Sequence, residues 1–487
     1  MTIQYEVKPE REEYPLLEEI RLHLTIRNVG GAALELANPS SRSSQPTYTL
    51  RGPSFPKGRT FNKIELEGLV LEPQSPPDSD RIRIEPGASW DGTVSLTRSL
   101  RLEAPGDYEL TSRLQLAQAQ AQSPNVVFRV KQISPDSADA GVGWRQGGAG
   151  EGELAFLQRT ESGTLLYAQQ FHEVRQDTGE VRMFPLQLRR HLDAQTADVR
   201  VPWTNATFHA ETTRWLIWRQ GATVAALDTY DTLVSARLPA APSALVRPAL
   251  RAAGEPPEVL ALGEGGRALH LVRFGKVGKV EWTAALPADA KAIVAGLGSE
   301  QKGSPRHVAF AAHTEEGVAI YHSRYTRDGA LTAFESVAFD ARKPGDEPRG
   351  RARLLDVFTP ALHVEGKDET WAGFLAQDGE ETLWLEAHFA RGLFGSDNSV
   401  RATRLGPLTG KPVGGALLYV DDKSGSIVRR EVVLLLDTGK LVRLTDGVLR
   451  EESVQGVPTI PLLLAPGRDF TYMLYADKVR GPYFAAI

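Results

Sequence analysis

Seven short apolar runs recur along the chain between residues 154 and 476, spaced on average about 53 residues apart. Most are followed within a few residues by a tight polar turn such as Asp437-Thr438-Gly439, and Gly, Asn and Asp suit such turns because they tolerate positive φ. A second apolar run follows each turn, and in six of the seven a more amphipathic segment comes next, for example Val280–Ala284. This recurrence predicts a series of small antiparallel sheets. The runs are Leu154–Leu157, Trp215–Trp218, Val259–Leu262, Val308–Ala312, Trp371–Leu375, Val432–Leu436 and Tyr472–Ala476.

The spacing is irregular but fits the range of roughly 40 to 50 residues and upward that propeller blades occupy. Apolar inner strands with wetter outer strands suit radial sheets that pack face to face, whereas the uneven period does not suit a solenoid. We therefore predict a β-propeller over residues 153–487. Seven blades are preferred, and six or eight remain open.

The sequence ends at Ile487, directly after the third strand of the seventh unit. An open sheet edge invites pairing with other chains. We therefore expect a strand that precedes the first unit to complete the last sheet.

The first 131 residues are predicted to be a string of short strands. Ile20, Leu22, Leu24 and Ile26 alternate with polar residues, the pattern of a sheet with one wet face. About eight such segments separated by turn signals predict a β-sandwich. Residues 132–152 are polar and rich in Gly and Ser, and are predicted to be a linker.

The residues of three turns in this segment resemble those of a known family of domains. A Pro-Gly turn precedes each of two late strands, at Pro86-Gly87 and Pro105-Gly106, and Asn28-Val29-Gly30-Gly31 follows an early one. This arrangement resembles the immunoglobulin-like sandwiches of bacterial accessory domains, including the intracellular proteinase-inhibitor (BsuPI) type. The resemblance implies a fold and not an inhibitory activity. Antibody-type domains differ in having a cysteine pair, which this chain lacks.

Composition excludes several classes of protein. Without cysteine the chain has no disulfide scaffold, thiolate zinc site or cysteine nucleophile. A net charge of −5, from 56 basic and 61 acidic residues, indicates no nucleic-acid partner. No apolar run approaches the roughly 18 residues that cross a bilayer, and no secretory leader follows Met1, so we expect no membrane insertion and a cytoplasmic location. Arginine outnumbers lysine by 42 to 14, as in GC-rich bacterial genomes.

Catalytic and metal-binding motifs were sought and not found. There is no Gly-x-Ser-x-Gly elbow, and Gly410-Lys411-Pro412 fails the phosphate-loop pattern because Pro replaces Ser or Thr. The ten histidines form no His-x-x-x-His pair. We therefore predict no catalytic residue, no metal site and no cofactor.

The densest aromatic cluster lies between residues 200 and 218. Trp203 and His209 stand beside polar residues on the expected innermost strand, so we consider them candidate ligand-binding residues that offer planar rings for stacking. Trp215 and Trp218 are instead expected in the core between blades.

A segment without any acidic residue, Asn38–Lys63, contains cations among serines, prolines and aromatic residues. A long loop of this composition is typical of binding loops, and a positive patch on a slightly negative protein favours an acidic protein partner. The alternative is a solvated loop without a partner. The candidate residues are Arg42, Arg51, Lys57 and Arg59.

These patterns favour a non-enzymatic protein–protein interaction or scaffold module in a bacterial complex, with the sandwich and the propeller offering separate surfaces. The alternative is an enzyme or carbohydrate-binding protein that uses the central funnel of the propeller. An enzyme would need convergent carboxylates, histidines or arginines at one mouth of that funnel.

Overall fold

The computed structural model shows an all-β chain made of two compact units. The first unit holds residues 1–134 together with Lys478–Gly481, and the second holds the remainder. Among the described residues, no helix is long and apolar enough to cross a membrane. The described residues are 3–39, 46–67, 81–115, 120–133, 140–144, 151–160, 163–175, 180–192, 200–206, 214–228, 230–246, 258–297, 306–315, 317–325, 331–339, 352–355, 362–363, 369–392, 395–421, 427–445, 448–453, 460–466, 471–477 and 481–486.

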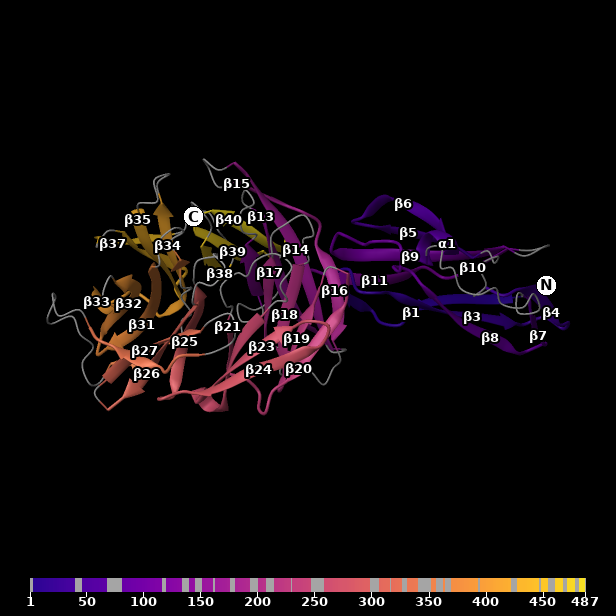
Figure 1. Ribbon diagram of the computed structural model, residues 1–487. Coiled ribbons are helices and arrows are strands. Elements are labelled where there is room, and N and C mark those ends of the chain that lie inside the picture. The colour runs from indigo at the N-terminus through magenta and orange to yellow at the C-terminus, as the bar shows by residue number, and fades with distance from the viewer. Residues whose placement is uncertain are drawn as a thin grey trace. The chain divides into compact units, whose positions relative to one another are not determined.

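Two main sheets form the N-terminal unit (Figure 1). The first has the order β1 (Ile3–Pro9), β3 (Arg21–Asn28), β8 (Ser89–Ser95). The second has the order β2 (Glu13–Pro15), β11 (Val126–Lys131), β9 (Gly106–Gln115), β5 (Pro46–Gly52), β6 (Phe55–Asn62), and β10 (Gln120–Gln122) also pairs with β9. Only β2 and β11 pair in parallel among these strands. The pair β4 (Leu34–Ala37) and β7 (Arg81–Ile84) and the short helix α1 (Lys63–Glu67) complete the described part of the unit.

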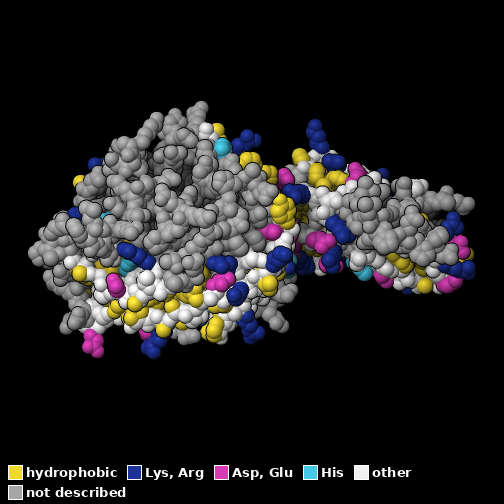
Figure 2. Space-filling view, in the orientation of Figure 1, with side chains coloured by type: hydrophobic (Ala, Val, Ile, Leu, Met, Phe, Trp, Pro, Cys, Tyr) yellow, Lys and Arg dark blue, Asp and Glu magenta, His cyan; other side chains and the backbone are white. Residues whose placement is uncertain are grey.

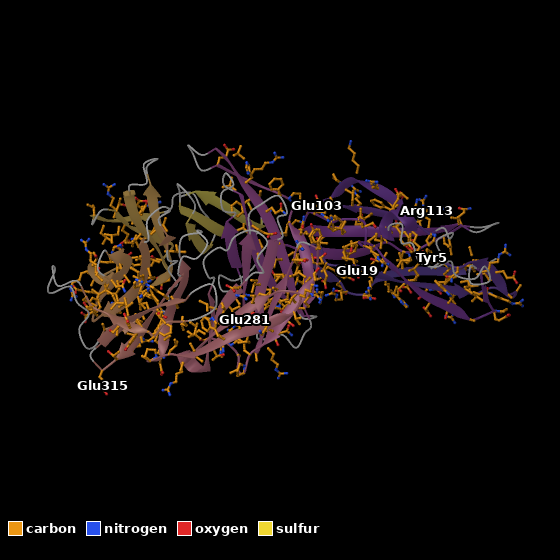
Figure 3. All side chains as sticks on the ribbon, in the orientation of Figure 1. Tyr5, Glu19, Glu103, Arg113, Glu281 and Glu315 are labelled. Atoms are coloured by element: carbon orange, nitrogen blue, oxygen red, sulfur yellow. The ribbon has the colours of Figure 1, made fainter. Side chains whose placement is uncertain are left out.

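Alternating side chains build the core between these two sheets. Leu22, Leu24 and Ile26 are fully buried, as their period of two predicts, while the residues between them face outward. Strand β1 contacts β9 and β11 of the other sheet. Tyr5 on β1, labelled in Figure 3, makes a 2.8 Å hydrogen bond to Ser112 Oγ on β9. The two sheets therefore enclose one core with a polar link across it.

Seven antiparallel sheets follow one another in the described part of the C-terminal unit, each built from strands that neighbour one another in sequence. We number them sheets 1 to 7. Sheet 1 has β12 (Ala140–Trp144), β13 (Glu151–Thr160), β14 (Gly163–Arg175) and β15 (Glu180–Met183), with β16 (Gln187–Leu192) also on β14. Sheet 2 has β17 (Arg200–Ala206), β18 (Arg214–Gln220), β19 (Thr223–Leu227) and β20 (Leu233–Arg237). Sheet 3 has β21 (Ala244–Val246), β22 (Glu258–Gly263), β23 (Ala268–Phe274) and β24 (Gly278–Ala285).

The remaining four sheets repeat this plan. Sheet 4 has β25 (Ala290–Leu297), β26 (Arg306–Thr314), β27 (Gly317–Tyr325) and β28 (Glu335–Val337). Sheet 5 has β29 (Arg353–Leu354), β30 (Leu362–His363), β31 (Glu369–Asp378), β32 (Glu381–Gly392) and β33 (Gly395–Gly406). Sheet 6 has β34 (Pro412–Asp421), β35 (Ile427–Leu436), β36 (Lys440–Thr445) and β37 (Val448–Ser453). Sheet 7 has β38 (Ile460–Pro466), β39 (Thr471–Asp477) and β40 (Gly481–Ala486).

Each sheet packs its apolar face on the next one. Buried clusters join sheets 1 and 2, 2 and 3, 3 and 4, 4 and 5, and 5 and 6. Strand β38 of sheet 7 contacts both β34 of sheet 6 and β12 of sheet 1, so the series returns to its start, as Figure 1 shows. Successive four-stranded meanders packed face to face around a ring are the architecture of a β-propeller.

All seven predicted apolar runs lie within the second strands of these sheets, from β13 to β39. The sheets also begin earlier than expected, because β12 pairs with β13 inside the range 132–152 that was predicted to be a linker. Within the described residues, sheet 7 has three strands and β40 pairs with no strand from the N-terminal part of the chain. The expected completion of the last sheet is therefore not found in the part of the chain that the structure describes.

Candidate functional site

Residues 46–62 of the acid-free segment form an edge hairpin in the N-terminal unit. Strand β6 is the last strand of its sheet, and its eight residues pair only with β5 among the described strands. Arg51 lies near the end of β5, and Lys57 and Arg59 lie on β6. All three are exposed. Arg42, the fourth predicted residue, lies outside the described residues.

The backbone of β6 is poorly suited to accept another strand. Pro56 has no N–H to donate, and Gly58 has a φ of 75°, which interrupts the regular ladder. Proline, bulges and cations are features that protect sheet edges from adding further strands. A partner would therefore meet the side chains of this hairpin rather than extend its sheet.

Arg59 is held in place by its neighbours. Its guanidinium carbon lies 4.8 Å from the centre of the Phe61 ring, and one of its nitrogens lies 4.0 Å from Glu65 Oε1. Phe55 meets Phe61 edge-on at 5.3 Å between ring centres. The Phe61 ring therefore makes a cation–π contact with the charged guanidinium of Arg59.

Strand register separates the predicted cations. Thr49 and Thr60 lie on the outer face of the hairpin, where their hydroxyl oxygens are 2.9 Å apart. Arg51 shares that face because it is two residues from Thr49, whereas Arg59 pairs with the buried Leu50 and lies on the other face. The hairpin thus offers cations on both faces of one edge and not as a single flat patch.

The structure describes only part of the predicted aromatic site. Trp203 lies on β17, the innermost strand of sheet 2, and pairs with Ile217, but its side chain is outside the described part of the structure, as is all of His209. Trp218 is 1% exposed and packs with Leu157 in the cluster between sheets 1 and 2. The expectation that Trp218 belongs to the core is therefore confirmed.

Two clusters of one arginine between two glutamates lie in the second unit and were not predicted from the sequence. We call them charge clamps. Glu258 on β22 accepts a 2.7 Å hydrogen bond from Arg273 Nε on β23, and Arg273 also lies 3.4 Å from Glu281 on β24, labelled in Figure 3. Sheet 6 repeats the arrangement with Glu431, Arg443 and Glu452. The only sequence signal is an acid directly before the apolar run, as at Glu258-Val259 and Glu431-Val432.

Both clamps connect the second, third and fourth strands of one sheet. The Glu258 and Glu431 side chains are at most 2% exposed, so each needs its arginine as a counter-charge. Burial alone would lower the pKa of Arg443, yet the hydrogen bonds and charges of Glu431 and Glu452 raise it above its ordinary value. These pairs join neighbouring strands of one sheet. Among the described residues, no group of three or more His, Asp or Glu side chains is placed to hold a metal ion.

Exposed apolar side chains mark a third feature of the second unit. We call the hairpin of the third and fourth strands of a sheet its outer hairpin. In the described part of this unit, every large hydrophobic side chain that is exposed lies on an outer hairpin, in sheets 1, 2, 3 and 6. They are Val174, Phe184, Tyr230, Leu233, Val277, Val448 and Leu449.

No protein-family model matches the sequence, and no curated protein matches it either. Solved β-propellers align with the structure at low identity. The Nup133 propeller of Vanderwaltozyma polyspora aligns at 8% identity over 77% of this chain and all of its own, with a TM-score of 0.44. A six-bladed fucose-binding lectin of Aleuria aurantia aligns at 10% identity over 66% of this chain and 97% of its own, with a TM-score of 0.36. The AfRom2 CNH domain aligns at 11% identity over 74% of this chain and 94% of its own, with a TM-score of 0.37. The propeller assignment rests on sheet order and packing and not on these similarities.

Proposed function

We propose that this chain is a non-enzymatic interaction protein of the bacterial cytoplasm whose β5–β6 hairpin docks an acidic surface of a partner protein. The observation that carries the proposal is the hairpin itself, because its described residues present Arg51, Lys57 and Arg59 to solvent and include no acid. In the described structure, neither Arg51 nor Lys57 lies within 4.0 Å of a carboxylate. Glu109 on β9 is the cross-strand neighbour of Arg51, and a protein surface rich in carboxylates would supply closer counter-charges.

The fold of the N-terminal unit supports a recognition role. We infer that it is an immunoglobulin-like sandwich, since one sheet has the order β1-β3-β8 and the other adds a short parallel strand, β2, beside β11. Tyr108, near the start of β9, donates a 2.6 Å hydrogen bond to the carbonyl oxygen of Ala104 four residues earlier. That link is the tyrosine corner of such sandwiches. The resemblance to BsuPI-type domains stays a prediction.

For the C-terminal unit we propose that sheets 1 to 7 are seven blades of one propeller. The packing of each sheet on the next and the contact of β38 with β12 support that number. A rigid ring of this kind presents loops from many blades on one face, which suits a scaffold.

Charge reversal tests the proposed docking. The full-length chain carrying Arg51→Glu, Lys57→Glu and Arg59→Glu is compared with wild type by affinity purification from the source bacterium. The identified partner is then purified, and its binding is titrated at several salt concentrations. We expect the triple variant to lose at least about tenfold in affinity and most of the salt dependence.

A matched control changes three other exposed cations of the same unit. The Arg27→Glu, Arg81→Glu and Arg101→Glu variant alters the net charge equally and should bind as wild type does. If the affinity purification recovers this chain without any partner, the proposed interaction function is wrong. Equal loss in both triple variants would show a general charge effect and would remove the hairpin from the proposal.

A further inference from the structure

The outer hairpins of sheets 2 and 3 lie side by side and both carry apolar side chains into solvent. Tyr230 is 82% exposed, Val277 is 76% exposed and Leu233 is 42% exposed. Strand β20 contacts β24. Figure 2 shows hydrophobic side chains beside Lys and Arg along the lower border of this unit, where Figure 1 labels these two strands. Exposed apolar groups gathered on adjacent elements mark interaction sites more often than scattered ones do.

A close backbone approach fixes the two hairpins against each other. A Cβ atom added to Gly278 would lie 2.3 Å from the carbonyl oxygen of Ser235, so the β23–β24 turn rests directly on β20. Gly278 follows Val277, and Ser235 is two residues from Leu233. The turn that carries Val277 therefore lies against the strand that carries Leu233.

Tyr230 is presented on a braced turn. The buried Asp228 accepts hydrogen bonds at its Oδ1 from the backbone N–H groups of Tyr230, at 2.8 Å, and of Thr232, at 2.7 Å. Arg189 donates to the Asp228 carbonyl oxygen and to Asp231 Oδ1, both at 2.9 Å. An aromatic ring on a turn that is already ordered loses little entropy when a partner binds it.

In the described part of this surface, the acidic side chains are paired with cations, and the exposed Lys276 is not paired with an acid. The acid nearest in sequence to the tyrosine, Asp231, is neutralised by Arg189, and Glu281 lies 3.6 Å from Lys279. Lys276 stands next to Val277, is exposed, and has no carboxylate within 4.0 Å among the described residues. A complementary surface would surround an apolar pocket with acids.

We propose that Tyr230, Leu233 and Val277 form a second docking site, which inserts the Tyr230 ring into an apolar pocket of a partner protein bordered by carboxylates. The inference rests on the proposed interaction function but uses residues of the other unit, so either can fail alone. Trp, Tyr and Arg dominate binding energy at protein interfaces, and here the tyrosine is the central anchor.

Site-specific photocrosslinking in the source bacterium tests this site. A photoreactive phenylalanine analogue replaces Tyr230 in the full-length chain, and a matched chain carries it at the exposed Arg401 on β33 of sheet 5. We expect an adduct with a different protein from position 230 and none from position 401. The crosslinked protein is identified by mass spectrometry, purified, and titrated with the full-length chain.

In that titration we expect Tyr230→Ala to weaken binding at least about tenfold, as at an interface hot spot. Lys276→Glu should weaken it about threefold or more and reduce its salt dependence. Arg401→Ala, on sheet 5, should leave the affinity unchanged. Binding that is insensitive to both substitutions would overturn the inference, as would equal adducts at both positions or an adduct with a second copy of this chain.

The Arg51, Lys57 and Arg59 reversal separates the two proposals. If the Tyr230 adduct persists in that triple variant, the second site stands without the first. If no adduct forms while hairpin-dependent binding persists, this inference fails and the proposed function stands.

Discussion

Tyr5 links the two sheets of the N-terminal unit through a buried chain of hydrogen bonds. Ser112 Oγ donates to the Thr47 carbonyl oxygen at 3.1 Å, so Tyr5 donates to Ser112 Oγ at 2.8 Å. The ring is 3% exposed. Burial, partly offset by the hydrogen bond to Ser112, raises the pKa of Tyr5 to about 12.

This raised pKa makes the stability of the unit depend on alkaline pH. Because the folded state holds the Tyr5 proton more tightly than the unfolded state does, the contribution is fully present below about pH 10, the ordinary tyrosine value. It is lost as pH rises from about 10 to about 12. At pH 11 the unfolding equilibrium constant should be about tenfold larger from this group alone, which is about 1.4 kcal/mol.

A single buried thiol can report this unfolding, because the chain has no cysteine of its own. Val94, on β8, is 1% exposed, so a Val94→Cys background is labelled by a thiol reagent only when the unit opens. Above about pH 10 the thiolate is fully formed, and its reactivity no longer changes with pH. The labelling rate is measured between pH 9 and 12 with and without Tyr5→Phe.

Tyr5→Phe should raise the labelling rate at pH 9, because removal of the hydrogen bond costs about 1 kcal/mol. Between pH 9 and 11, the labelling rate of the chain that keeps Tyr5 should then rise about tenfold more than the rate of the Tyr5→Phe variant. The raised pKa values of Tyr14 and Tyr108 affect both proteins alike and cancel in the ratio. Parallel pH profiles for the two proteins would refute the reasoning.

Four further substitutions test packing and buried polar links, each by urea denaturation of the full-length chain. Glu431→Gln should destabilise the second unit by about 3 kcal/mol because it leaves Arg443 without its buried counter-charge, whereas Glu452→Gln, at an exposed acid, should cost less than about 1 kcal/mol. Gly373→Ala should cost about 1 to 3 kcal/mol, since its Cβ would lie 2.0 Å from the Trp384 ring; an unchanged midpoint would contradict that packing. Tyr108→Phe should cost about 1 to 2 kcal/mol because its hydroxyl loses the hydrogen bonds to the Ala104 carbonyl oxygen and to Ser54, and a neutral result would show that these bonds do not stabilise the unit.

Local patterns predicted the repeating part of this fold. The run Val432–Leu436 lies inside β35, and the turn after it contains Gly439 at a φ of 80°. Both features depend on a few consecutive residues, namely an apolar segment and a residue that tolerates positive φ. The same patterns predicted the second strand of each of sheets 1 to 7.

Strands defined by their partners were harder to predict. Residues 140–144 have two glycines and little alternation, and they form β12 because each residue pairs with one of β13. Arg51 and Arg59 look like one cluster in the sequence, yet the register of β5 against β6 places them on opposite faces. A shift of one residue would have reversed that outcome.

The kind of secondary structure, its repetition and the absence of a cysteine staple followed from short-range pattern and composition. Which side chains meet was set by tertiary packing. Tertiary packing placed Arg443 between Glu431 and Glu452, and it brought Gly278 against Ser235 of another sheet. Those contacts depend on strand register and on the packing of one sheet against the next, and neither is encoded in the spacing of residues along the chain.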